Sequence, residues 1–480
     1  MVLTFTDFYW QWLLIPFLTI LSIYFTVRLG GVQFRLIPEM FRIMRDAPGT
    51  AEDGKKAISS FQAFSISAAA RIGTGNVVGV AGAIAVGGPG AVLWMWLMAM
   101  LLGAASFVES TLAQLYKVRD KQSFRGGPAF YMQHGLGKRW MGAIFAVTIT
   151  VTFGFVFNAV QSNTISTAIA GSVEATGATA PGWLAPLVGA VLVAVSAAVV
   201  FGGVRRIARV SELLVPVMAL SYILMGIVVV ALNVDQIPNV LAQIVTGGLG
   251  LREFAGAALG TAIIQGARRG MFSNEAGLGS APNAGATATV THPVKQGLVQ
   301  TLGVYFDTLV VCSVTAFIIL VNDPVYGEGR GPALTQDALE ASLGTWSLHL
   351  LTAVLLMLCY SSVLGNYFYG ENNVGFLSRS TGVMTGFKVV FLGAVFFGSI
   401  GTVDIVWNLA DTTMGFMALI NLLALAPLSG VVVALLKDYV AQRKQGIDPV
   451  FTRDRLPQLT GVQCWEPEPQ VRDDSVTDKV

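Results

Sequence analysis

Long apolar segments separated by short polar ones dominate this chain of 480 residues. A helix that crosses a membrane needs about 17 to 25 mostly apolar residues in a row. By that measure the sequence predicts an all-α polytopic membrane protein with about eleven transmembrane helices. Their approximate limits are 9–27, 72–90, 91–115, 140–170, 183–201, 211–232, 254–288, 297–320, 347–369, 386–402 and 406–436.

Basic residues fall in alternate connections between these segments. They are frequent between the first two predicted spans, from Arg28 to Lys56, and after the third, from Lys117 to Arg139, whereas the loops between these are almost bare. Because Lys and Arg stay on the cytoplasmic side, this alternation predicts an outside N-terminus, a cytoplasmic C-terminus and location in the inner or plasma membrane. The start lacks the basic flank and cleavage site of a signal peptide, so we expect a retained first helix.

Composition adds a constraint on class. Hydrophobic residues make up 54% of the chain and charged residues only 12%, whereas a soluble domain carries roughly a quarter charged residues. The three cysteines and three histidines show no metal-ligand spacing, and HExxH, GxSxG and P-loop motifs are missing. We therefore expect neither an enzyme nor an ATP-driven pump, and no cofactor and no nucleic-acid partner.

Two predicted spans are interrupted by glycine and polar residues. They are RIGTGNVVGVAGAIAVGGPG (71–90) and QGARRGMFSNEAGLGSAPNAGATA (265–288). Without the first span, the others form two sets of five, each opening with an interrupted member, and an odd number inverts the second set. Interrupted helices at matching positions of inverted repeats indicate a transporter binding site. The alternative for single glycines is close helix packing.

This pattern divides the chain into an N-terminal helix and loop (1–64), a first repeat (65–232), a second repeat (254–436) and a cytoplasmic tail (437–480). We expect the tail, with its many charged residues, to have little fixed structure.

Several motifs resemble the alanine or glycine:cation symporter family. They are GGPGAVLWMWLMAMLLG (87–103), FRGGPAFYM (124–132), VQSNTIS (160–166) and MFSNEAGLGSAPNAGA (271–286), and the resemblance runs from about residue 20 to about 455. It implies import of a small neutral amino acid with a cation, mostly sodium and sometimes protons. It also implies a fold similar to the leucine transporter, with five-plus-five inverted repeats and one helix added in front.

The first interruption suits such a substrate. An unwound helix offers N–H groups to a carboxylate and carbonyls to a cation. We therefore predict substrate contacts at Thr74, Gly75, Asn76 and Gly79, and sodium contacts at the carbonyls around Gly75 and Val78.

Further site residues follow from other polar positions within spans. Asn274 lies in the second interruption, and Gln161 is a substrate contact by the resemblance. By the resemblance, Ser361 and Ser362 correspond to a hydroxyl pair that similar transporters place beside a sodium ion. The alternative for each serine is a hydrogen bond back to the preceding helical turn. Asn366 stands where many relatives carry Trp, which predicts a more polar or larger pocket.

Charged residues within spans leave the coupling ion open. Arg71, Glu275 and Asp307 are candidates for gating or coupling, and either carboxylate could carry a proton or simply pair with an arginine. The main prediction is sodium-coupled symport of alanine or glycine. The alternatives are a proton-coupled carrier of a neutral amino acid such as glutamine or serine, and, outside this class, an ion channel.

Overall fold

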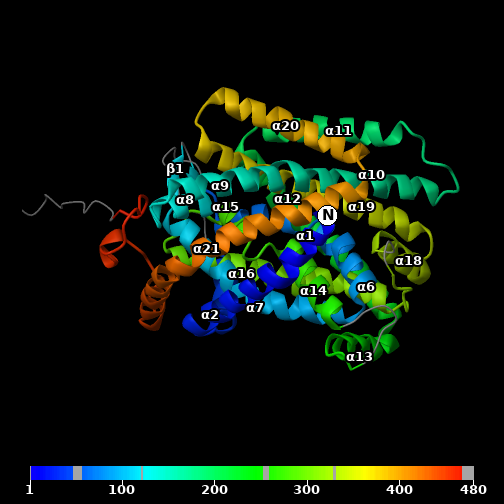
Figure 1. Cartoon of the computed structure of the whole chain (residues 1–480), viewed down its shortest axis with the longest axis horizontal. Coiled ribbons are helices and arrows are strands. Elements are labelled where there is room, and N and C mark those ends of the chain that lie inside the picture. Colours follow the sequence, from blue (N-terminus) through cyan, green and yellow to red (C-terminus); the bar gives the residue numbers. More distant parts are fainter. Residues whose placement is uncertain (1, 47–56, 121–122, 252–258, 328–330, 467–480) are drawn as a thin grey trace, which may run out of the picture.

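The computed structural model describes residues 2–46, 57–120, 123–251, 259–327 and 331–466. Long helices run side by side along the longest axis of the molecule (Figure 1). The first part folds into α1 (Val2–Tyr9), η1 (Trp10–Leu14), α2 (Ile15–Arg28), α3 (Val32–Arg35), α4 (Ile37–Ile43), α5 (Ser60–Arg71), η2 (Gly75–Gly79), α6 (Val80–Gly87) and α7 (Gly90–Leu115).

The middle part begins with a short antiparallel hairpin and continues with helices. Its elements are β1 (Val118–Asp120), β2 (Ser123–Arg125), α8 (Pro128–His134), α9 (Arg139–Ile149), η3 (Thr150–Phe157), α10 (Asn158–Glu174), α11 (Leu184–Val200), α12 (Val204–Leu232), η4 (Val234–Gln236) and α13 (Ile237–Gly248).

The last part contains the second interrupted helix and the longest helices. Its elements are α14 (Leu259–Asn274), α15 (Ala281–Gly285), α16 (Pro293–Tyr305), η5 (Phe306–Cys312), α17 (Ser313–Leu320), α18 (Gly331–Leu343), α19 (Trp346–Leu377), α20 (Thr381–Ile400), α21 (Val403–Lys444) and η6 (Arg453–Arg455).

Most of the predicted spans appear as helices that can cross a membrane. Within the described residues, eight helical runs are long and apolar enough, and a ninth is the bent pair Ser60–Arg71 and Gly75–Gly87. The fifth predicted span is α11, of only 17 residues. The seventh begins at Leu259 and is interrupted after Asn274, and its residues 254–258 lie outside the described part. The chain is thus an all-α polytopic membrane protein.

The first half of the bent pair lies outside the predicted spans, because the second was expected to begin only at residue 72. α5 is only weakly apolar, yet ten of its twelve residues are buried because it lies among other helices rather than against lipid. Ser59 caps it with a capping box: its hydroxyl accepts the N–H of Gln62, whose side chain accepts the N–H of Ser59. The broken span therefore starts at Ser60, five residues before the predicted repeat boundary.

The C-terminal segment is also more ordered than predicted. α21 continues to Lys444, and the following chain packs back onto the basic end of the bundle. The N–H of Phe451 donates to Thr291 O at 2.8 Å, and the indole N–H of the buried Trp465 donates to Leu115 O at 3.2 Å. These contacts fix the tail up to its described end at residue 466.

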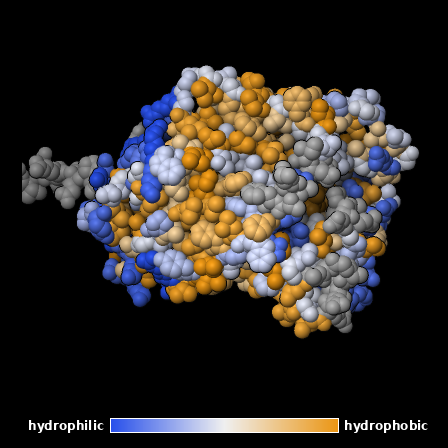
Figure 2. Space-filling view, in the orientation of Figure 1, coloured by the Kyte–Doolittle hydropathy of each residue, from blue (hydrophilic) through white to orange (hydrophobic). Residues whose placement is uncertain are grey.

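The surface matches a membrane setting. Figure 2 shows hydrophobic side chains over the middle of the visible face and hydrophilic ones gathered toward the end that carries β1 and α8. On α12 the large side chains of Leu213, Leu220 and Leu224 are 74%, 59% and 59% exposed. Such apolar stripes on long helices face lipid in a multi-pass membrane protein.

Candidate functional site

The first interruption lies where α5 ends. Ile72 leaves the helix with an extended backbone, and the chain turns by 53° before the π-helical turn η2. The N–H of Gly73 donates to Asn76 Oδ1 at 2.9 Å, so the Asn76 side chain holds the chain that leads into the second half-helix. Residues 72 to 77 are buried throughout, so the backbone of the interruption lies inside the protein.

Helix α10 holds this interruption through side chains. Gln161 Oε1 accepts both the N–H of Thr74 at 3.1 Å and its hydroxyl at 2.7 Å. Thr74 Oγ1 also lies 3.1 Å from Thr164 Oγ1 and 3.3 Å from Cys359 Sγ. The two predicted residues Thr74 and Gln161 are therefore in direct contact, and Thr164 is a partner that the sequence did not single out.

The second interruption begins after α14. Glu275 has a positive φ of 58°, which is strained for a non-glycine residue, and its carboxylate accepts the hydroxyl of Ser280 at 2.7 Å. The predicted Asn274 is engaged at both ends of its amide, since it donates to Thr308 Oγ1 at 3.1 Å and accepts the N–H of Ala276 at 3.0 Å.

A carboxylate on α7 accepts hydrogen bonds from the backbone N–H groups of the second interruption. Glu109 is fully buried and accepts the N–H of Gly277 at 3.2 Å and that of Gly279 at 3.0 Å. Asn421 donates to the same carboxylate at 2.8 Å. The Glu109 carboxylate, the two glycine N–H groups and the Asn421 amide thus form one hydrogen-bonded unit. These bonds offset the cost of burying the carboxylate.

Asp307, on η5, connects the two interruptions. Its Oδ1 accepts the Asn76 amide at 2.7 Å, and its Oδ2 accepts the hydroxyls of Ser273 at 2.8 Å and Thr308 at 3.1 Å. Gly75 permits this approach, because a Cβ there would lie 2.9 Å from the ring of Phe272. Among the described residues no basic side chain lies within 4.0 Å of Asp307, and its direct partners are hydrogen-bond donors.

The arginines are committed elsewhere. Arg71 donates to Gln300 O at 3.2 Å, while its Nε and Nη2 have no hydrogen-bond partner among the described residues. Arg268 pairs with Asp7 at 2.9 Å and Arg269 with Asp411 at 3.0 Å. The alternative of an arginine ion pair for Glu275 or Asp307 is therefore not realised in this structure.

The two serines of α19 face α5. The hydroxyl of Ser361 lies 3.2 Å from Ala69 O, and that of Ser362 lies 3.4 Å from Ile72 O. Both also approach Leu358 O, at 2.8 and 3.2 Å. Two hydroxyls and three carbonyls, all neutral oxygens, thus meet at the end of the first half-helix.

The carbonyls at this place are not the predicted ones. Gly75 O accepts the N–H of Val80 within the π-helical turn, and Val78 lines a separate cavity. The carbonyls that lie beside the two serines are those of Ala69 and Ile72, because the chain leaves the helix at Ile72 rather than within the glycine cluster.

Asn366 has an unusual environment. It lies one turn after Ser362 on α19 and is fully buried. Neither its Nδ2 nor its Oδ1 has a hydrogen-bond partner among the described residues. Buried amides are nearly always bonded, so this one is suited to bind a polar ligand.

A cavity of about 310 Å³ reaches the first interruption from the other end of the bundle. It is lined by Val77, Val78, Thr164 and Trp407, with Glu174 among its other lining residues. At the lining residue Trp407, the ring lies 5.0 Å from that of Phe272, and the guanidinium of Arg269 lies 5.1 Å from it. Around Gly79 there is room, because a Cβ would meet only Thr74 O, at 4.0 Å.

Two interrupted helices joined by a buried polar network in an all-α bundle define a multi-pass membrane transporter of the leucine-transporter type. The fold is similar to that of Mhp1, a nucleobase-cation-symport-1 family transporter in a closed conformation with bromovinylhydantoin bound. The TM-score is 0.51 with 14% identity, over 84% of this chain and 82% of that one. Residues 1–453 match the sodium:alanine symporter family, and the chain belongs to this family.

Relatives extend over nearly the whole chain. It is 50% identical to the probable sodium/glutamine symporter GlnT of Bacillus subtilis, over 96% of this chain and 94% of that protein. It is 49% identical to the amino-acid carrier protein AlsT of the same organism, over 97% of each. It is 36% identical to the sodium/alanine symporter AgcS of Methanococcus maripaludis, over 92% of this chain and 98% of that protein. The family prediction is thus confirmed, and the chain is an amino acid symporter rather than an enzyme.

Three residues of the site carried little signal in the sequence. Glu109 lay near a predicted helix end, Ser273 stood beside the more conspicuous Asn274, and Thr164 followed Gln161 by three positions. That last spacing places Thr164 on the same helix face as Gln161 and is the one pattern that could have identified it.

Proposed function

We propose that the protein imports a small neutral amino acid together with sodium. The observation that carries this proposal is the set of neutral oxygens from Ser361, Ser362, Ala69, Ile72 and Leu358. Hydroxyl and carbonyl oxygens are hard ligands that suit an alkali cation, and they do not titrate near neutral pH. The site also borders the first interruption, so cation binding would order the chain that contacts the substrate.

The amino acid would bind at the first interruption. Its carboxylate suits the N–H groups at the start of the second half-helix, near Thr74, Gly75 and Asn76, where it would replace neutral amide acceptors. Gln161 orients this segment through Thr74, and Gly79 leaves space beside it. In support, the 310 Å³ cavity leads to Val77 and Val78 of the same turn, which provides access for a small solute.

Glutamine or another polar neutral amino acid is a second candidate substrate. It is favoured by the unpartnered amide of Asn366, which offers one donor and one acceptor, the complement of a carboxamide. A relative at 50% identity is named a probable sodium/glutamine symporter. Proton coupling stays an alternative through Asp307, which links both interruptions, and through Glu275, with Arg71 as a gating residue.

Counterflow in proteoliposomes tests the main proposal. Vesicles loaded with unlabelled alanine should accumulate labelled alanine without ATP when sodium is present, and should stop when choline replaces sodium at fixed pH. The variant Ser361→Ala/Ser362→Ala should need much more sodium for the same uptake. If uptake by the wild type is independent of sodium but driven by a pH gradient, the coupling ion is a proton and not sodium.

The same vesicles test the substrate. We expect glycine, alanine, serine and glutamine to compete for the labelled alanine, and charged amino acids to fail. Saturable uptake excludes a channel, whereas a non-saturating conductance would establish one.

The orientation of the chain is also a proposal. We infer an outside N-terminus, a cytoplasmic C-terminus and location in the plasma membrane, because the described C-terminal segment packs on the end of the bundle that carries the basic loops. A reporter fused to each terminus should be protected from an external protease only at the C-terminus; protection at the N-terminus instead would invert the topology.

A further inference from the structure

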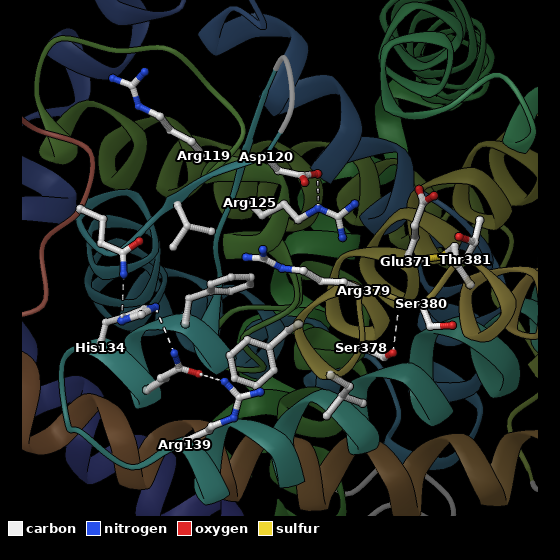
Figure 3. Close-up of a pocket in the computed structure, with 18 of the residues that line it drawn as sticks. Arg119, Asp120, Arg125, His134, Arg139, Glu371, Ser378, Arg379, Ser380 and Thr381 are labelled. Atoms are coloured by element: carbon white, nitrogen blue, oxygen red, sulfur yellow. Dashed lines mark hydrogen bonds and ion pairs between the residues drawn. The ribbon is translucent and has the colours of Figure 1, made fainter.

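A second and larger cavity, of about 1100 Å³, lies at the end of the bundle that carries the basic loops. It is formed by the β1–β2 hairpin, α8, the start of α9, the end of α19 and the start of α20 (Figure 3). The helical run Arg139–Glu174 separates it from the transport site, since Arg139 lines this cavity and Glu174 lines the 310 Å³ one. The two cavities share no lining residue and lie at opposite ends of the same span.

The large cavity carries an excess of positive charge. Figure 3 shows Arg125, Arg139 and Arg379 around one hollow, while Arg119 points away from it. Arg125 is paired with Asp120, at 2.5 Å. Arg379 forms no ion pair with the described residues. The basic lining residues are Arg119, Arg125, Arg139, Arg379 and Lys388, against the carboxylates of Asp120 and Glu371.

Hydroxyls and a helix N-terminus complete the cavity. Ser378, Ser380 and Thr381 line it where α20 begins, and the Ser378 hydroxyl accepts the N–H of Ser380 at 3.2 Å. α20 is 20 residues long, and the Ser380 side chain makes no capping bond to it. The first N–H groups of such a helix favour an anion, and arginine is the side chain that best matches a phosphate.

The cavity lies at the level of the membrane surface, with apolar surface leading away from it. Arg139 is the first residue of a span, and the following Trp140 is 64% exposed, as expected for an interfacial anchor. On the other side, Val389 and Val390 of α20 are 62% and 53% exposed. A ligand with a charged head and apolar chains can therefore place its head among the arginines and its chains along α9 and α20.

We propose that this cavity binds the phosphate headgroup of an anionic phospholipid. Basic pockets between helices on the cytoplasmic side are the sites at which such lipids are held. The lipid would join the hairpin, α9 and α20, of which α9 and α20 both pack against α19. A free phosphate shares the headgroup chemistry, but it would leave the exposed apolar flanks without a role.

Lipid-dependent unfolding of the purified full chain tests the proposal. The protein in detergent is titrated with dioleoylphosphatidylglycerol, with dioleoylphosphatidylcholine and with glycerol 3-phosphate, and its thermal unfolding is followed. We expect stabilisation by the first lipid alone. Because each arginine near an anionic lipid contributes about 1 kcal/mol, Arg139→Ala/Arg379→Ala should raise the half-saturating phosphatidylglycerol concentration about 25-fold.

Two further variants control for damage to the fold. Arg379→Gln changes one exposed side chain and should shift the half-saturation about fivefold. Arg45→Ala removes an exposed arginine of the first basic loop, outside the cavity, and should behave as wild type. An unchanged half-saturation in both cavity variants would overturn the proposal. Equal stabilisation by glycerol 3-phosphate would also overturn it and make the ligand a soluble anion.

Discussion

Gly73 offers a sharp test of the transport site. A Cβ built there would meet the hydroxyl of Ser362 and would lie 3.0 Å from Gln161 Oε1. Its backbone is not in the left-handed region, so alanine is excluded by space and not by conformation. Gly73→Ala therefore places a methyl group between the interruption and the two side chains that we assign to sodium and to substrate.

The magnitude follows from the cost of overpacking. Adding a methyl group to a packed site costs about 1–3 kcal/mol. If the cost is relieved by displacing Ser362 or Gln161, it appears as weaker binding, and each 1.4 kcal/mol corresponds to about tenfold in affinity. We therefore expect the half-saturating sodium concentration of uptake to rise by about 5- to 150-fold.

The assay is sodium-dependent uptake of labelled alanine in proteoliposomes. Gly82→Ala on α6 is the matched control, because a Cβ at Gly82 meets nothing within 4 Å. It should leave the sodium curve unchanged. Unaltered sodium activation in Gly73→Ala, with normal protein content in the vesicles, would refute the assignment of Ser362 to the cation.

Three other substitutions test separate features. Asn366→Leu removes a buried amide without partners among the described residues, so it should raise the free energy of unfolding by about 1–3 kcal/mol. It should also weaken competition by glutamine more than competition by alanine. A lower unfolding midpoint would contradict this prediction. Glu109→Gln weakens the acceptor for the N–H groups of Gly277 and Gly279 and should cost about 3 kcal/mol of stability, which an unchanged midpoint in detergent would disprove. Burial lowers the pKa of the Lys117 ammonium from 10.5 to about 7. At pH values between these two pKa values the unfolded chain binds more protons than the folded one, so the free energy of unfolding should rise by about 1.4 kcal/mol per pH unit. Lys117→Met should abolish that slope in unfolding measurements from about pH 7 to about pH 9.

The sequence predicted the long lipid-facing helices because hydropathy reports contact with lipid. It missed α5 for the same reason, since that half-helix is enclosed by protein and needs no apolar surface. α14 carries Arg268 and Arg269 near its end for a related reason, because both arginines pair with acidic side chains of the protein. Composition alone therefore locates the scaffold better than the two interrupted helices at its centre.

The sequence marked the residue types around the first interruption but not the position at which the helix ends. Glycine content marked the region of the first interruption, yet the chain leaves the helix at Ile72, before the glycines. The carbonyls beside Ser361 and Ser362 accordingly come from an earlier turn than predicted. Asp307 was identified as an unusual charge, but its contact with Asn76 depends on helices 231 positions apart in the sequence.

The two interruptions differ in the groups that satisfy their backbone, and this difference indicates which of them binds substrate. At the second, Glu109 already accepts two N–H groups, so these donors are held by a charged acceptor. At the first, the N–H groups of Gly73 and Thr74 are held only by the neutral amides of Asn76 and Gln161. Hydrogen bonds to a charged acceptor are stronger than those to a neutral one. A substrate carboxylate can therefore displace the amide oxygens of Asn76 and Gln161 from these N–H groups. On this argument the second interruption is a fixed support, and substrate binding reorganises the first.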